Sequence, residues 1–195
     1  MCVSLIGMIP GRSISPALFV AAVACGPGAG GTPRSASGDS APPAAPAPPP
    51  DPWAVRLDGI GPLRYGMPVA EVRVALRDTL GPPPPADDCV YLVPASVPAG
   101  IRLMIQSGKL VRVDVDSAGI RTVGGAEVGM SETDLRTRYR DLEVRPHKYD
   151  TAAHYLIYRE HPDSSRRLVF ETDWQRVLRY RGGVMPPVEY VEGCS

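Results

Sequence analysis

The sequence predicts an α+β fold in which one unit, a short helix packed on antiparallel strands, occurs twice in tandem. One observation is an internal match: segment 61–73 aligns with segment 124–136 at a constant offset of 63 positions. The other is that short segments of alternating apolar residues follow each copy of the matched segment. Together they place the two repeat units at about 53–118 and 119–195.

Both predicted helices begin directly after a Gly-Met pair. In the first copy Pro68 suits the first helical position, and in the second Ser131 is a good N-cap with Asp134 three residues later. Met130 and Leu135 form the expected hydrophobic staple. The run of prolines at 82–85 ends the first helix. The apolar faces are Val69, Val72, Leu76 and Leu80 in the first helix and Leu135, Tyr139 and Leu142 in the second.

The predicted strands fall into two sets, one after each helix. The first set is 89–93, 101–106 and 110–115, and the second is 142–149, 153–160, 166–172 and 176–181, with a final extended segment at 188–191. Ser107-Gly108 suits a tight hairpin turn. In the third strand Val111, Val113 and Val115 alternate with Arg112, Asp114 and Asp116. This alternation predicts a sheet with one solvent-exposed face.

Residues 1–25 are predicted to be a signal peptide. They contain Arg12 and no acidic residue, and the apolar run at 14–24 is too short to span a bilayer. The ending Ala22-Val23-Ala24-Cys25 resembles the lipobox of bacterial lipoproteins, which predicts acylation of Cys25. The alternatives are an ordinary signal peptide cleaved after Ala24 and a translation start at Met8. We therefore expect an extracytoplasmic protein of the cell envelope, held to the membrane by lipid, and otherwise secreted or periplasmic.

Residues 26–52 are predicted to be a disordered linker. They are rich in proline, alanine and glycine and lack large apolar side chains, so they cannot bury enough surface to fold. The folded part is then 53–195. The whole chain has 21 basic and 21 acidic residues, and this neutrality gives no basic surface for a nucleic acid partner.

The two Gly-Met helix starts followed by antiparallel hairpins resemble the repeat unit of two exported families. One is the SmpA/OmlA-type outer-membrane assembly lipoproteins, which carry one unit, and the other is the β-lactamase-inhibitor-protein family, which carries two in tandem. The resemblance covers roughly residues 60–192 in layout. It implies a protein that acts by binding other proteins, not by catalysis. Only scaffold positions match, namely Gly66, Met67, Gly129 and Met130, so no functional residue is carried over.

Two cysteines remain in the predicted folded part. Cys2 lies in the predicted signal peptide and Cys25 is the lipidation candidate, which leaves Cys89 and Cys194. An oxidising compartment favours a disulfide between them, which would lock the two repeat units together. The alternatives are two free thiols or a metal site, and the absence of a CxxC spacing argues against zinc.

We expect no metal site and no cofactor. His147, His154 and His161 are spaced seven apart, but they fall near the ends of different segments and are interpreted as partly exposed surface residues. Asp114 and Asp116 share a predicted strand face, which supports the alternative of a hydrolase-like enzyme of unknown type. The motifs of nucleophile elbows, zinc proteases and phosphate-binding loops are absent from the sequence.

The hairpin over 166–181 is the candidate contact surface for a partner. Its predicted tip holds Trp174, with Arg176, Arg179 and Arg181 close by. Tryptophan, tyrosine and arginine are the residue types enriched in binding hot spots. The alternative is that most of the tyrosines of the second unit pack the core. The sequence thus predicts a non-catalytic module that binds an envelope protein or a cell-wall component, and a purely structural envelope module remains open.

Overall fold

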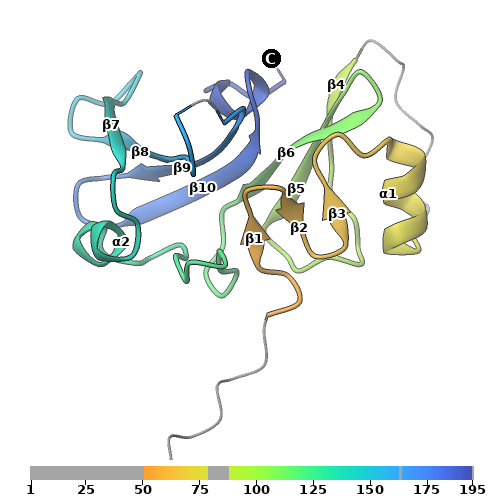
Figure 1. The fold of residues 1–195 in the computed structure, drawn as a ribbon, viewed down its shortest axis with the longest axis horizontal. Coiled ribbons are helices and arrows are strands. Elements are labelled where there is room, and N and C mark those ends of the chain that lie inside the picture. The colour runs from red at the N-terminus through yellow and green to blue at the C-terminus, as the bar shows by residue number, and fades with distance from the viewer. Residues whose placement is uncertain (1–50, 79–87, 163, 195) are drawn as a thin grey trace, which may run out of the picture. The chain divides into compact units, whose positions relative to one another are not determined.

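A computed structural model of the chain describes residues 51–78, 88–162 and 164–194 (Figure 1). The predicted signal peptide with Cys25 and the predicted linker up to residue 50 lie outside these residues, as do Leu80 and the prolines at 82–85. In the described part of the chain no helix is both long enough and apolar enough to cross a membrane.

The main element is an antiparallel sheet of seven strands in the order β4-β5-β6-β10-β9-β8-β7 (Figure 1). Their bounds are Cys89–Leu92 for β4, Ile101–Gln106 for β5, Lys109–Val115 for β6, Glu143–Pro146 for β7, His154–Tyr158 for β8, Arg166–Thr172 for β9 and Val177–Val184 for β10. The last strand of each predicted set lies at the centre, where Tyr180 of β10 pairs with Val115 of β6. A mixed α+β fold is therefore confirmed.

Close backbone approach joins β6 to β10. A Cβ atom added at Gly183 would lie 2.6 Å from the carbonyl oxygen of Val111, which is nearer than real Cβ atoms come. Glycine at this position therefore lets the two halves of the sheet pair directly.

A small sheet of three two-residue strands precedes the first helix, and the sequence did not predict it. It consists of β1 (Val55–Arg56), β2 (Gly59–Ile60) and β3 (Leu63–Arg64). Val55, Ile60 and Leu63 are fully buried. Two-residue strands are too short to show an alternating pattern, so the sequence carries no local signal for them.

Both helices begin within one residue of the predicted start, but Pro68 is the N-cap of the first helix and not its first helical residue. The second helix ends at Arg138, so Tyr139 and Leu142 of its predicted apolar face lie beyond it. Helix α1 (Val69–Leu76) follows Pro68 and buries Val72 and Leu76. Helix α2 (Glu132–Arg138) begins after Ser131, whose hydroxyl oxygen accepts the backbone N–H of Asp134 at 3.1 Å. The predicted N-cap is therefore confirmed, and the cap satisfies one of the free N–H groups at the helix start.

Each Gly-Met pair is hydrogen-bonded to the hairpin that follows it. Gly66 donates to the carbonyl of Leu110 at 2.7 Å, and Leu110 donates back to Met67 at 2.9 Å. The second copy makes the corresponding pair of bonds. Gly129 donates to Val177 at 2.8 Å, and Val177 donates back to Met130 at 2.9 Å. Both glycines have a φ of 89°, a conformation that favours glycine over other residues.

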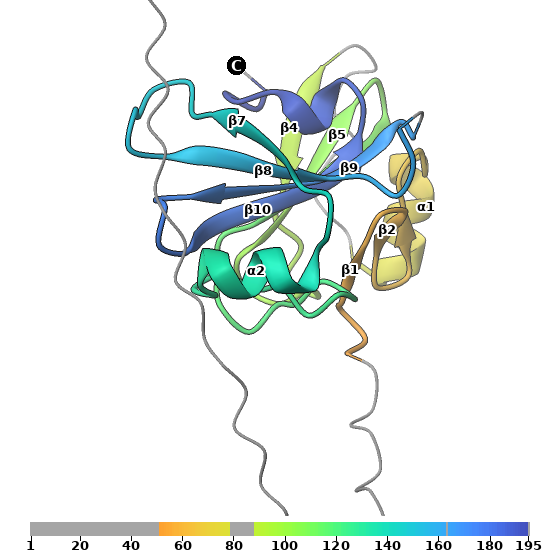
Figure 2. The same ribbon diagram turned by 60° about the vertical axis from the view of Figure 1, so that its left-hand side comes forward.

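The sheet is covered on both faces (Figure 2). On one face the main core joins the sheet to β1–β3, α1 and α2, with Phe170 and Tyr180 among its largest buried side chains. On the other face a second cluster contains Tyr155, Ile157, Val169 and Val188. Val188 lies in a 3₁₀ turn, η1 (Pro187–Glu189), where the sequence predicted an extended segment at 188–191. That prediction was wrong, because the chain turns there to bury Val188 against the sheet.

Candidate functional site

The tip of the β9–β10 hairpin presents the predicted contact residue Trp174. The carboxylate of Asp173 accepts the backbone N–H groups of Arg176 at 2.8 Å and Gln175 at 3.0 Å. These two hydrogen bonds hold the pKa of Asp173 below its usual value, and the one from Arg176 has the larger effect. The turn places Trp174 at a φ of 72°, and 61% of its surface is exposed.

Trp174 rests on a buried histidine. The centroids of the indole and the imidazole of His154 are 4.4 Å apart, in an edge-to-face arrangement. His154 belongs to β8 and only 2% of it is exposed. The sequence interpretation of His154 as a partly exposed surface residue is therefore wrong. The short local spacing of the histidines could not show that α2 covers this end of β8.

Glu132, in the first turn of α2, holds His154 in place. Its carboxylate lies 2.9 Å from Nε2 of His154, accepts the hydroxyl of Thr172 at 2.8 Å, and forms an ion pair with Arg136 at 2.7 Å. Burial raises the pKa of Glu132, but hydrogen bonds from Thr172, Arg136 and His154 outweigh it and the pKa lies below its usual value. An ionised, hydrogen-bonded carboxylate thus fixes the support beneath Trp174.

The three predicted contact arginines do not share one surface. Arg176 is exposed at the hairpin tip. Arg179 is also exposed, and its guanidinium lies 2.5 Å from the carboxylate of Glu171. Arg181 is buried, and its Nε donates to the carbonyl of Val188 at 2.7 Å. The prediction that Arg181 is a contact residue of an exposed hairpin was therefore wrong, because the C-terminal residues cover this part of β10.

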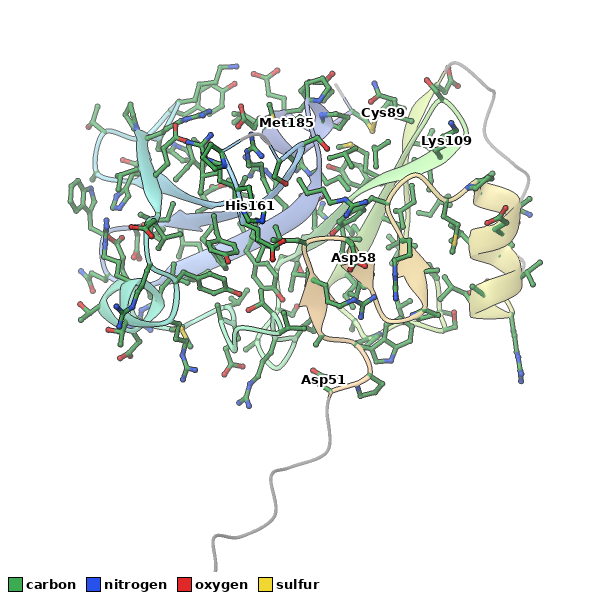
Figure 3. All side chains as sticks on the ribbon, in the orientation of Figure 1. Asp51, Asp58, Cys89, Lys109, His161 and Met185 are labelled. Carbon is green, nitrogen blue, oxygen red and sulfur yellow. A yellow bond between two sulfur atoms is a disulfide. The ribbon has the colours of Figure 1, made fainter. Side chains whose placement is uncertain are left out.

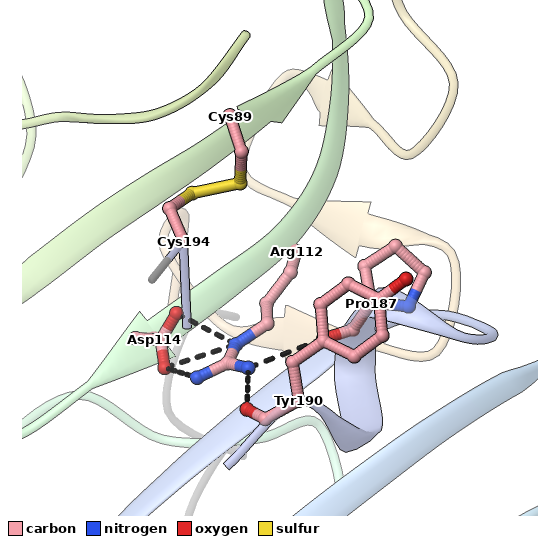
Figure 4. The surroundings of a disulfide bond; sticks show 6 residues. All are labelled: Cys89, Arg112, Asp114, Pro187, Tyr190 and Cys194. Carbon is pink, nitrogen blue, oxygen red and sulfur yellow. Dashed lines mark hydrogen bonds and ion pairs between the residues drawn. A yellow bond between two sulfur atoms is a disulfide. The ribbon is translucent and has the colours of Figure 1, made fainter. Parts of the chain in front are cut away.

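Arg112 and Asp114 on β6 are also buried, at 4% and 8% exposure. Nε of Arg112 donates to both carboxylate oxygens of Asp114, at 2.9 and 3.1 Å (Figure 4). The sequence predicted a solvent-exposed face here, and that prediction was wrong. An alternating strand pattern shows which residues share a face, but not whether a distant segment covers that face.

The covering segment is residues 186–194, here called the C-terminal strap. The guanidinium of Arg112 donates to the backbone carbonyls of Pro187 at 3.1 Å and Tyr190 at 2.6 Å (Figure 4). At the end of the strap Cys194 forms a disulfide with Cys89 of β4, with Cα atoms 5.2 Å apart. The strap is therefore held to the sheet by buried arginines and by a covalent bond.

Asp114 and Asp116 do not form a carboxylate pair in the arrangement that an enzyme would need. The carboxylate of Asp114 is engaged by Arg112, and Asp116, beyond the end of β6, lies 3.7 Å from Arg102. A buried carboxylate with its oxygens occupied by a guanidinium is not positioned to accept a substrate proton.

The histidines also lie apart. Nε2 of His147 is 3.1 Å from Glu171 on the strap side of the sheet, His154 contacts Glu132 beneath α2, and His161 is exposed. Within the described ranges there is no group of three or more histidine, cysteine, aspartate or glutamate residues that could hold a metal ion.

The predicted disulfide between Cys89 and Cys194 is confirmed, but sequence reasoning did not find the path of the strap across the sheet or the support beneath Trp174. A weak signal for the strap exists, since Val188 and Val191 are apolar residues between a pair of prolines and Cys194. For the support, Glu132 and His154 are 22 residues apart and belong to different elements. Only the packing of α2 on β8 brings them together.

The fold and the site define an α+β protein whose C-terminal strap is closed by a disulfide and whose hairpin tip exposes a supported tryptophan. Comparison of the chain with protein-family models, with curated proteins and with solved structures finds no match.

Proposed function

We propose that the chain is a non-catalytic binding module of the cell envelope, and that a protein partner docks on the β9–β10 hairpin around Trp174. The observation that supports this proposal is that Trp174 is 61% exposed and that its ring is nevertheless held in position by contact with the ring of His154. An apolar ring kept in water gains free energy when a partner buries it. A ring that is already positioned loses less conformational entropy on binding.

The charges around Trp174 indicate the chemistry of the partner. Arg176 and Arg179 are exposed on the same hairpin, and the side chain of Arg136 on α2 is 43% exposed. Leu178 adds an exposed apolar side chain. Arg179 and Arg136 already pair with Glu171 and Glu132, so Arg176 is the arginine left to attract a charge on the partner. An aromatic anchor beside this cation fits an apolar pocket on a protein that carries an acidic residue at the rim.

The proposal includes export and a lipid anchor at Cys25. Two features support it: the signal-peptide pattern of residues 1–25 with its lipobox-like ending, and the pairing of Cys89 with Cys194, which suits an oxidising compartment. Labelling with a palmitate analogue tests the anchor, with Cys25→Ser as the control. Label that persists in the Cys25→Ser chain would contradict lipidation at this position.

The proposal also includes a tandem repeat, with units at about 53–118 and 119–195. Its support is the equivalence of the bonds that Gly66 and Met67 make with Leu110 to those that Gly129 and Met130 make with Val177. Kinship with the β-lactamase-inhibitor-protein family and the SmpA/OmlA-type lipoproteins is part of the same proposal and rests on this layout.

Photo-crosslinking in intact cells tests the binding function. A photoreactive phenylalanine analogue replaces Trp174 in the full chain, and the matched control carries it at Val74, which is 78% exposed on α1. We expect a protein adduct from position 174 that is absent from position 74 and is lost when Arg176→Glu is added.

Equal adducts from both positions, or no adduct from position 174, would overturn the docking surface. An adduct with a cell-wall glycan in place of a protein would overturn the protein partner and favour a cell-wall component.

A further inference from the structure

A cleft of about 990 Å³ is present that the residues of the strap do not line. Its walls are the β1–β2 turn, the end of α2 and the β8–β9 loop. Figure 3 labels Asp58 of the β1–β2 turn, which lines the cleft. Five arginines line the cleft and give it the name used below, the arginine cleft: Arg56, Arg138, Arg140, Arg159 and Arg166.

Two of these arginines are neutralised within the protein. Arg56 forms an ion pair with Asp58 at 3.0 Å, and Arg159 forms one with Glu143 at 2.7 Å. For Arg138, Arg140 and Arg166 the described residues provide no ion pair or hydrogen bond to the guanidinium group. Asp141 and Glu160 also line the cleft, so the cationic groups outnumber the acidic ones.

The floor of the cleft is aromatic and rigid. The rings of Tyr139 and Tyr158 are in edge-to-face contact with centroids 4.7 Å apart. The hydroxyl of Tyr139 donates to Oγ1 of Thr122 at 2.7 Å, which fixes the ring. Burial raises the pKa of Tyr139, so its phenol remains neutral. Leu57 and Val123 add apolar surface beside the rings.

We propose that the arginine cleft is a binding site for a ligand that carries a phosphate group on an apolar or polyol body. Guanidinium groups match phosphate oxygens with paired hydrogen bonds, and three arginines line this cleft without an ion pair or hydrogen bond from the described residues. The aromatic floor accommodates the body of the ligand. The volume suits a small molecule or a headgroup, and a concave site of this size is the usual form for such ligands.

The phosphate group could come from a soluble phosphate ester or from the headgroup of an anionic phospholipid. Two probes separate these sources. One is glycerol 1-phosphate in isothermal titration, and the other is cosedimentation with vesicles of phosphatidylglycerol, compared with vesicles of phosphatidylcholine. The full chain carries Cys25→Ser in every arm so that an acyl chain does not cause vesicle binding. Ionic strength is held at about 0.15 M, where distant surface charges are largely screened.

The test variant combines Arg138→Gln with Arg166→Gln, and the matched control is Lys109→Gln, which removes an exposed cation from the β5–β6 hairpin. We expect the test variant to bind about tenfold more weakly or worse, since hydrogen bonds between charged groups are lost. The control should bind as the parent chain does. If the double variant does not fold, as judged by its melting temperature, the exposed Arg140→Gln replaces it.

Binding of glycerol 1-phosphate that depends on the arginines supports the site with a soluble ester as its source. Binding restricted to phosphatidylglycerol vesicles, with the same dependence, supports it with a lipid headgroup as its source. The proposal is overturned if neither probe binds the parent chain, or if Lys109→Gln weakens binding as much as the test variant does. Because the cleft does not include Trp174, the photo-crosslinking result and this result are independent.

Discussion

The guanidinium group of Arg112 donates a hydrogen bond of 2.6 Å to the backbone carbonyl of Tyr190, 78 residues further along the chain. The same group forms a buried ion pair with Asp114. Arg112 therefore connects a central strand of the sheet to the C-terminal strap. Breaking a buried ion pair by removing one partner leaves the other charge in a medium that solvates it poorly.

Replacement of Arg112 by methionine is expected to lower the free energy of unfolding by about 3 to 5 kcal/mol, because Asp114 then remains buried without its cation. Urea unfolding followed by circular dichroism measures the change. The matched control is Arg121→Met, which removes a half-exposed pair with Glu127 and should cost about 1 kcal/mol or less.

A second variant separates the two roles of Arg112. With Arg112→Met, the added change Asp114→Leu should restore part of the lost stability, because no charge is then left buried. If the protein with Arg112→Met alone is as stable as the protein with Arg121→Met, the view that Arg112 holds the strap is contradicted.

The disulfide is predicted to fasten the strap and to stabilise the fold. The paired change Cys89→Ser with Cys194→Ser opens a loop with a sequence separation of 105. We expect a loss of about 4 kcal/mol from the free energy of unfolding. Thermal melting with and without a thiol reductant measures it. The reductant should lower the melting temperature of the parent chain and leave the serine variant unchanged, and equal melting of all samples would contradict the prediction.

Trp174 is predicted to contribute little to stability. Replacement by alanine removes an exposed ring and its contact with His154, at a cost of about 1 kcal/mol. Because residue 174 has a φ of 72°, glycine at this position should be more stable than alanine by about 1 kcal/mol. Urea unfolding of both variants tests this order. A loss of about 3 kcal/mol or more for alanine would show that the ring is part of the core. Glycine less stable than alanine would contradict the argument from the backbone conformation.

Stability is expected to fall in acid partly through Glu132. The folded protein holds the pKa of this carboxyl below its ordinary value of 4.5. Its contribution is therefore complete above that value and is lost as the pH falls through the lower pKa of the folded state. Urea unfolding from about pH 6 to about pH 3 measures the slope.

Glu132→Gln should flatten this pH dependence without abolishing it, because the pKa values of Glu143 and Glu171 are lowered as well. The exposed Glu71 provides the matched control, since Glu71→Gln removes a carboxylate from the first turn of α1. A Glu132→Gln variant whose stability falls as steeply as that of the parent chain would argue against this role of Glu132.

Local patterns predicted most of the secondary structure. The strand predicted at 101–106 is β5, and that predicted at 166–172 is β9, with the same bounds. Both helices follow their Gly-Met pairs, because capping and turn signals act within a few residues. The strands β1–β3 and the turn η1 were missed, since each is stabilised by contacts with distant parts of the sheet.

The candidate site was likewise predictable from the sequence only in part. Trp174 is exposed at a hairpin tip, as its position between two alternating segments predicted. The burial of Arg181 was not predictable, because it depends on η1 lying across β10. The arginine cleft has no sequence signature either, since its cations come from four separate segments of the chain.

The sequence by itself determined the α+β class, the helix starts, most strands and the cysteines available for pairing, because these follow from periodicity, capping and composition. The tertiary structure alone decided which sheet face is covered, which arginines are paired and which are free, and what lies beneath Trp174. The physical reason is that burial and charge compensation depend on contacts between residues such as Arg112 and Tyr190, and no local pattern records such contacts.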